Sequence, residues 1–223
     1  LSFVFQRGKC RGCSAGISWQ YLLVEILTGI IFLGVYLSSP FTVLSTFSIV
    51  PAIWFVYYLI VFCLLVVILV YDMRHKIIPD MLSYTFIALG LVRFIAELYL
   101  NGWRWQYADT LNILAGPILF CAFYALWYLS DGRWMGFGDA KLVLGIGLFL
   151  GFVLGVSTVI IGFWVGAVVG ILLLLLGRLS RHSHFSSFFH KIQLYLGVPG
   201  LTIKSELPFA PFLIVGILTA FFF

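Results

Sequence analysis

Long apolar stretches separated by short polar segments run through the whole 223-residue chain. Each stretch is about as long as the roughly 20 residues that an α-helix needs to cross a bilayer, and the alternation typical of a transmembrane β-strand is missing. The pattern therefore predicts an all-α, polytopic membrane helix bundle of about seven transmembrane helices. We expect these helices at roughly 20–38, 52–71, 81–100, 110–129, 140–153, 155–177 and 207–223.

The fifth predicted helix differs from the others because it is short and rich in glycine. Its C-terminal part runs into the sequence GIGLFLGFVLG. Small residues let helix backbones approach one another closely inside a membrane. The stretch therefore predicts either close helix packing or a break in the helix.

Composition and charge support a membrane location. Hydrophobic residues make up 63% of the chain and charged residues 9%, with a mean hydropathy of +1.14, whereas a soluble domain carries roughly a quarter charged residues. The net charge of +5 comes mainly from the N-terminal segment and the connections after the second, fourth and sixth predicted helices. These segments share one side if the helices alternate, so the positive-inside rule predicts that this side is cytoplasmic. Topology thus accounts for the basic charge and argues against nucleic acid as a partner.

Two of the few acidic residues are expected at the same depth of the membrane. Asp72 ends the second predicted helix and Asp139 begins the fifth, both on the predicted cytoplasmic side. Ionisable groups are costly in or near hydrocarbon, which makes both candidates for function. Each also has a structural interpretation: Asp72 could be an interfacial anchor paired with Arg74 or Lys76, and Asp139 an N-cap.

A pair of facing aspartates is the chemical equipment of an aspartyl protease. Two carboxyl groups at close range share one proton, so the ionised member activates water while the protonated member polarises the scissile carbonyl. Gly136 and Gly138 precede Asp139, and we interpret them as residues that permit positive φ and the close approach of a substrate backbone. The alternative for this pair of glycines is a simple flexible turn.

Two further acids lie on the same predicted side. Asp80 begins the third predicted helix, where capping accounts for it. Glu25 lies just inside the first predicted helix, and we favour a structural role for it over membership of a second polar site.

Four segments together resemble a known family. They are YDMRHKIIPD, GFGDAKL, CRGCSAGISWQYLLVEILTG and LPFAPFL, which begin at residues 71, 136, 10 and 207. The combination is similar to the bacterial type IV prepilin peptidase (leader peptidase/N-methyltransferase) family, a GxGD type of aspartyl protease. By position the resemblance makes Asp72 and Asp139 the catalytic pair. In the last segment Ala210 stands where the family pattern has glycine.

The resemblance implies a function. Such enzymes are endopeptidases of the bacterial inner membrane that remove the leader peptide of type IV prepilins and pseudopilins at the cytoplasmic face. The peptidase step needs no cofactor, and many members then methylate the new N-terminus with S-adenosylmethionine. The expected partners are a prepilin substrate and the lipid bilayer; the oligomeric state stays open. Supporting or substrate-binding roles are expected for Gly136, Gly138, Lys141, Asp80 and Glu25.

The N-terminal part departs from the family pattern. Bifunctional members carry two CxxC pairs that resemble a zinc site, whereas this sequence has only Cys10 and Cys13. A zinc site would require a second CxxC upstream, and methyl transfer is left open for the same reason. We therefore expect residues 1–19 to be the remnant of a cytoplasmic cysteine-containing segment. Residues 20–223 form the expected transmembrane peptidase domain, with a cytoplasmic loop at about 178–205.

Three other functions are compatible with parts of this sequence. Another GxGD intramembrane protease, of the preflagellin peptidase or presenilin type, would share the aspartates but leave the CxxC segment unexplained. A small proton-coupled transporter using Asp72 and Asp139 would be expected to hold its acids near the bilayer midplane and to show repeated halves. A membrane scaffold would use the acids only as caps.

Overall fold

The computed structural model describes residues 6, 8–9, 12–16, 19–38, 49–180 and 208–223. These residues form helices, with one isolated bridge between Lys9 and Gly16 and no β-strand among them. The prediction of an all-α fold is confirmed. Two compact units can be distinguished, Leu1–Val70 with Phe222 and Tyr71–Phe221 with Phe223, and each is considered by itself.

The first unit contains α2 (Trp19–Ser38) and most of α3 (Ile49–His75), whose last residues belong to the second unit. Both helices are long and apolar enough to cross a membrane, with mean hydropathies of 2.0 and 3.0. Many of their large apolar side chains are exposed, as expected of surfaces that face lipid.

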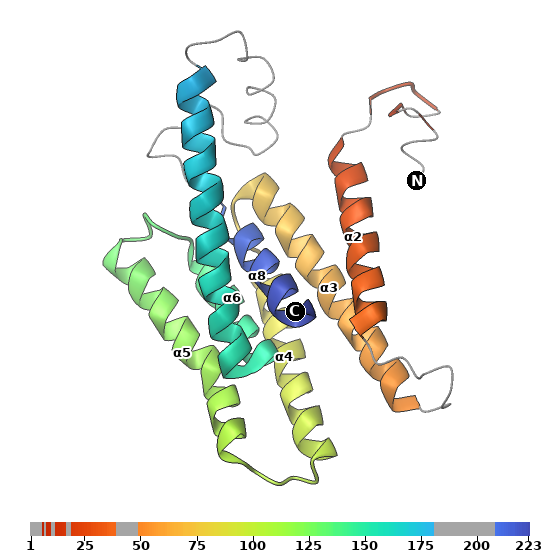
Figure 1. Ribbon diagram of the computed structural model, residues 1–223, viewed down its shortest axis with the longest axis vertical. Helices are drawn as coiled ribbons and strands as arrows, with labels where there is room; N and C mark the ends of the chain where they lie inside the picture. Colours follow the sequence, from red (N-terminus) through yellow and green to blue (C-terminus); the bar gives the residue numbers. More distant parts are fainter. Residues whose placement is uncertain (1–5, 7, 10–11, 17–18, 39–48, 181–207) are drawn as a thin grey trace. The chain divides into compact units, whose positions relative to one another are not determined.

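The second unit contains α4 (Asp80–Leu100), α5 (Tyr107–Leu129), α6 (Phe137–Ser180) and α8 (Ala210–Phe222). Helices α4 and α5 run antiparallel and are joined by the 101–106 connection at one end (Figure 1). Helix α6 packs mainly on α5 and α4. The contact with α5 is very close, since a Cβ added at Gly147 would lie 2.5 Å from the backbone nitrogen of Gly116. The predicted close packing of the glycine-rich stretch is confirmed.

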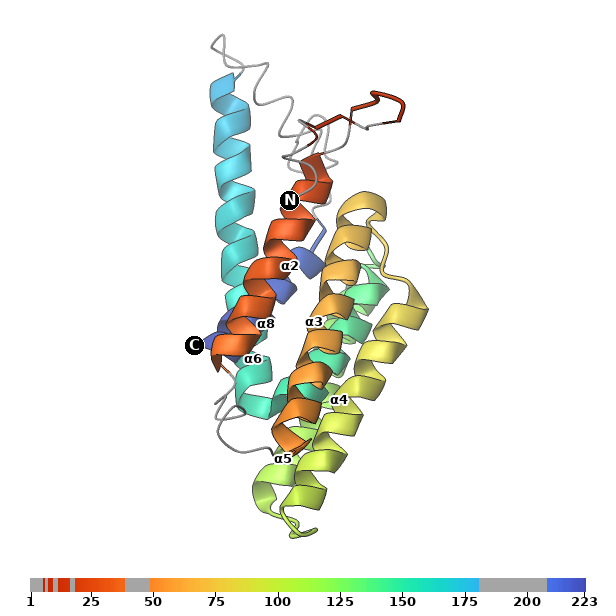
Figure 2. The same cartoon turned by 90° about the vertical axis from the view of Figure 1, so that its right-hand side faces the viewer.

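Helix α6 is also broken, at Gly151. This residue has φ 79° and ψ −173°, outside the helical region, and the chain turns back there, so that the two arms of α6 run side by side (Figures 1 and 2). The arms touch through glycines, because a Cβ at Gly155 would lie 3.3 Å from Cα of Gly147. The predicted helices 140–153 and 155–177 correspond to these two arms.

Side chains from neighbouring helices satisfy the backbone groups that this break exposes. The Arg93 guanidinium of α4 donates to the carbonyl oxygen of Phe149, and the N–H of Phe152 donates to Oδ1 of Asn112 on α5 at 3.2 Å. A helix end in hydrocarbon needs such partners, because lipid offers neither donors nor acceptors. Arg93 also pairs with Glu97 at 2.8 Å.

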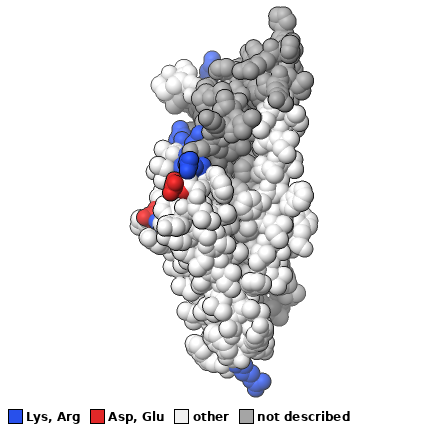
Figure 3. Space-filling model, turned by 90° about the vertical axis from the view of Figure 1, so that its left-hand side faces the viewer, with Lys and Arg blue, Asp and Glu red and all other residues white. Residues whose placement is uncertain are grey.

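Five helices of the described residues are long and apolar enough to span a membrane, and α8 is a shorter apolar helix of 13 residues. The prediction of about seven agrees with this arrangement when the two arms of α6 are taken separately. The protein is thus a multi-pass membrane protein. Figure 3 shows a face with few charged side chains, most of which lie in the upper half of the view. The predicted loop at 178–205 lies outside the described residues from residue 181 onwards, as does most of the segment 1–19.

Replacement of Gly151 by alanine should destabilise the protein. The φ and ψ of this residue lie in a region that is essentially limited to glycine, which costs other residues about 1–3 kcal/mol, and an added Cβ would lie 2.6 Å from Oδ1 of Asn112. Thermal unfolding in detergent micelles measures the effect. Gly29→Ala is the matched control, because nothing lies within 4 Å of a Cβ at that helical position. Equal melting temperatures for the two variants would contradict this account of the break.

Candidate active site

Asp139 lies in the first turn of α6 and is 7% exposed. The helix begins at Phe137, so Asp139 is its third residue and not the N-cap that the sequence suggested. Its backbone N–H donates to the carbonyl oxygen of Gly136 at 3.1 Å. A Cβ added at Gly136 would lie 3.8 Å from Oδ2 of Asp139, so the carboxylate lies beside the residue that precedes the helix.

Asp72 lies in the last turn of α3 and is 4% exposed. No described residue forms an ion pair with it, so the structure does not support a surface anchor held by Arg74 or Lys76. The Oδ2 atom of Asp72 is buried and has no partner among the described residues.

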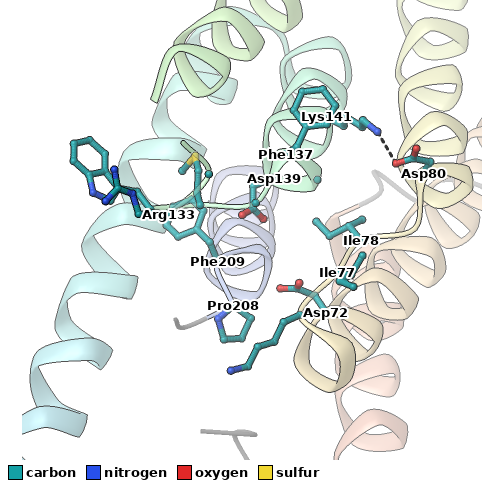
Figure 4. A pocket seen from close by; sticks show the side chains of 16 residues that line it. Asp72, Ile77, Ile78, Asp80, Arg133, Phe137, Asp139, Lys141, Pro208 and Phe209 are labelled. Carbon is teal, nitrogen blue, oxygen red and sulfur yellow. Dashed lines mark hydrogen bonds and ion pairs between the residues drawn. The ribbon is translucent and has the colours of Figure 1, made fainter. Parts of the chain in front are cut away.

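The two carboxylates point into one cavity of about 480 Å³ (Figure 4). They are close enough for the charge of Asp72 to act on Asp139. Three stretches of chain surround them, one around the start of α4, one around the start of α6 and one before α8. The lining residues are Asp72, Lys76, Ile77, Ile78, Asp80, Gly132, Arg133, Trp134, Met135, Gly136, Phe137, Gly138, Asp139, Lys141, Pro208 and Phe209. The structure thus brings together Asp72 and Asp139, which the sequence predicted to lie at a similar depth on one side of the membrane.

The two glycines before Asp139 do not have the conformation that we expected. Neither Gly136 nor Gly138 has positive φ; in this loop, positive φ occurs at Asp131 and Gly132. Gly138 is already helical, and a Cβ there would lie 3.0 Å from Cβ of Ile78. The small size of Gly138 therefore lets the start of α6 pack against the segment that follows Asp72. Gly136 has open space beside it, with no contact shorter than 3.8 Å for an added Cβ.

Lys141 and Asp80 form an ion pair across the cavity wall, with Nζ and Oδ1 2.5 Å apart (Figure 4). The Lys141 side chain is only 12% exposed, and its Nζ lies 4.7 Å from the ring centroid of Phe137 and 5.4 Å from that of Tyr84. Asp80 is the first residue of α4 and makes no side-chain cap. The interpretation of Asp80 as a cap is therefore wrong, because its carboxylate pairs with Lys141.

The remaining predicted site residues are Glu25 and the cysteine pair Cys10 and Cys13. Glu25 is exposed on α2 and is not among the lining residues. Cys13 is exposed, and Cys10 lies outside the described residues. No group of three or more His, Cys, Asp or Glu side chains in the described part of the chain could hold a metal ion.

The start of α8 belongs to the cavity and was not among the predicted site residues. Pro208 and Phe209 line the cavity just before α8 begins. The available signal was two prolines around an expected helix start in LPFAPFL, because proline is favoured in the first turn of a helix.

Comparison with known proteins adds family information to this geometry. A family model described as the bacterial peptidase A24 N-terminal domain matches residues 1–39. A protein named prepilin leader peptidase/N-methyltransferase from Dichelobacter nodosus is 31% identical over 144 residues, which are 64% of this chain and 46% of that protein. A protein of the same name from Bacillus subtilis (strain 168) is 32% identical over 152 residues, 68% of this chain and 54% of that protein.

This chain thus spans about half the length of these relatives. No solved structure matches it. A second family model, described as the type IV leader peptidase family, covers residues 59–171, which include both aspartates. The chain belongs to the type IV leader peptidase family.

Proposed function

We propose that the protein is an aspartyl endopeptidase that removes the leader peptide of type IV prepilins or pseudopilins. The observation that carries the proposal is the convergence of two buried carboxylates, Asp72 and Asp139, on one cavity. Family membership and the name shared by the relatives supply the substrate class.

The buried pair suits activation of water. Two carboxylates in one water-poor cavity share one proton, because both cannot be ionised there at low cost. The ionised carboxylate takes a proton from a water molecule, and the oxygen of that water attacks the scissile carbonyl carbon. The protonated carboxyl group donates a hydrogen bond to the carbonyl oxygen. The amine then leaves with a proton from the dyad.

The location of the cavity suits a substrate anchored in the bilayer. Its walls come from the connection after α3, the connection before α6 and the start of α8, which meet at one end of the second unit. These connections and the first turns of α6 carry Lys76, Arg133 and Lys141, so the positive-inside rule assigns this end to the cytoplasm. On this assignment the protein acts at the cytoplasmic face of the bacterial inner membrane, where the leader junction of a prepilin helix would lie.

The two carboxylates account for the peptidase step. The relatives' name also includes N-methyltransferase, and a second step of this kind would transfer a methyl group from S-adenosylmethionine to the newly exposed amine. No described residue is assigned to that donor.

The Lys141–Asp80 pair holds the two segments that carry the dyad. Lys141 is two residues beyond Asp139, and Asp80 ends the connection that follows Asp72. The pair therefore limits how far the start of α6 can move from the start of α4. We expect it to maintain the spacing of the carboxylates.

Either dyad aspartate should be indispensable for cleavage. Asp72→Asn and Asp139→Asn keep the side-chain volume but remove the acid, so each should lower the rate of leader removal by at least about 10³-fold. Co-expression with a prepilin, followed by gel shift and mass spectrometry of the new N-terminus, measures this. Asp131→Asn is the matched control, since Asp131 is exposed and lies outside the cavity lining. Cleavage that survives either dyad substitution would refute the mechanism.

A double-mutant cycle tests the ion pair. Lys141→Met and Asp80→Asn should be coupled by about 0.5–1 kcal/mol in unfolding free energy, because Lys141 is largely buried but Asp80 is half-exposed. Denaturation in mixed micelles measures the coupling. The exposed pair Arg133–Asp131, at 3.5 Å, is the control and should give at most about 0.2 kcal/mol. Equal coupling energies in the two cycles would contradict the idea that the Lys141–Asp80 pair fixes the start of α6 relative to the start of α4.

A further inference from the structure

The two aspartates of the dyad are carried by different helices. Asp72 lies in the last turn of α3 and Asp139 in the first turn of α6, whereas α6 packs mainly on α4 and α5. The connection between α3 and α4, residues 76–79, joins the turn that carries Asp72 to a helix on which α6 packs. The distance between the two carboxylates therefore depends on how this connection lies against the start of α6.

Both ends of the connection are hydrogen-bonded to the helices they join. The backbone N–H of Lys76 donates to the carbonyl oxygen of Asp72 at 2.8 Å, and the φ of Lys76 is 54°, which ends α3 in a left-handed turn. At the other end, the N–H of Ser83 donates to the carbonyl oxygen of Pro79 at 3.2 Å. Only residues 77–78 lie between these two anchors.

The Ile78 side chain lies directly against the start of α6. It is 5% exposed and lines the cavity into which both carboxylates point (Figure 4). A Cβ added at Gly138 would lie 3.0, 3.4 and 3.5 Å from Cβ, Cγ1 and Cδ1 of Ile78. The side chain thus follows the backbone of Gly138 along its length. Because Gly138 precedes Asp139, this contact is one residue away from the dyad.

The contact is stiff on both sides. The residue before a proline is restricted to extended conformations, and a β-branched side chain has few χ1 rotamers. Both restrictions apply to Ile78, which precedes Pro79, while Gly138 belongs to a helix. The ion pair between Lys141 and Asp80 draws the same two segments together. The attraction of the ion pair and the hard contact at Ile78 together determine how closely the segments approach.

We propose that Ile78 is a positioning residue of the active site. Its side chain is the stop against which the ion pair pulls, and it sets the separation of the Asp72 and Asp139 carboxylates. Ile78 itself touches neither the scissile bond nor the attacking water. The inference rests on the proposed peptidase function.

Shortening the side chain tests the proposal. Ile78→Ala should lower kcat for prepilin cleavage by about 10- to 100-fold, because a misplaced catalytic group loses its alignment, and KM should stay within about twofold. Ile78→Val keeps the Cβ and Cγ1 contacts and should retain kcat within about threefold. The matched control is Leu98→Ala, which removes a side chain of similar burial, 8% exposed, in the last turn of α4. Both alanine variants should lower the melting temperature in lipid nanodiscs, but Leu98→Ala should keep kcat within about threefold.

A change of the opposite sense can be made at Gly138. Gly138→Ala should push the two segments apart and lower kcat about 10-fold. Gly90→Ala is its control, because a Cβ there lies 3.1 Å from Cβ of Leu148, a similar crowding between α4 and α6 away from the dyad; its kcat should stay within about threefold. The double variant Ile78→Ala, Gly138→Ala should have a higher kcat than either single variant, since one change lets the segments approach and the other separates them.

The outcomes separate the two proposals. Losses of kcat that multiply in the double variant, or equal kcat in Ile78→Ala and Leu98→Ala, would overturn the positioning role. If Ile78→Ala does not fold, Gly138→Ala and Gly90→Ala decide, and equal kcat in these two variants would overturn it. A parent chain that cleaves the prepilin in these cases leaves the peptidase function intact. A parent chain that does not cleave would refute the peptidase function and the positioning role with it.

Discussion

Each buried polar group in this bundle has to be satisfied by the protein itself, because hydrocarbon offers no donor or acceptor. This requirement explains where the conspicuous polar side chains lie. Arg93 and Asn112 satisfy the backbone at the break in α6. Lys141 meets Asp80. Among the described residues, Oδ2 of Asp72 and Oγ of Ser83 are buried without a hydrogen-bond partner, and the first of these atoms lies at the cavity.

Small residues make these polar arrangements geometrically feasible. Gly147 brings α6 against α5, Gly138 brings the start of α6 against Ile78, and Gly216 brings α8 against α6. At each of these points a methyl group would require the backbone or a neighbouring side chain to move. Chain segments in direct contact have few alternative positions, so the polar side chains they carry are well placed relative to one another.

The sequence predicted the parts of this structure that depend on local pattern. Apolar runs located the helices, glycines located the break near Gly151, and the shared depth of Asp72 and Asp139 indicated that the two carboxylates lie close together. It did not predict the pairing of Lys141 with Asp80, because 61 residues separate them and nothing in their surroundings selects this pair. Pro208 and Phe209 were not predicted to line the cavity, because neither side chain carries a chemical group that marks a site. Positive φ was expected at Gly136 and Gly138, but neither glycine has it. Helix α6 begins at Phe137, before the predicted start at residue 140, so Gly138 is already part of the helix.

The reversal at Gly151 also determines where the second arm of α6 leads. A straight α6 would carry the chain away past the end of the second unit where α4 joins α5. Because α6 turns back, its second arm returns towards the end that holds the cavity, where Pro208 and Phe209 also lie just before α8. The N-terminal ends of the first arm of α6 and of α8, which carry the positive ends of the helix dipoles, are therefore found at the same cavity as Asp72 and Asp139.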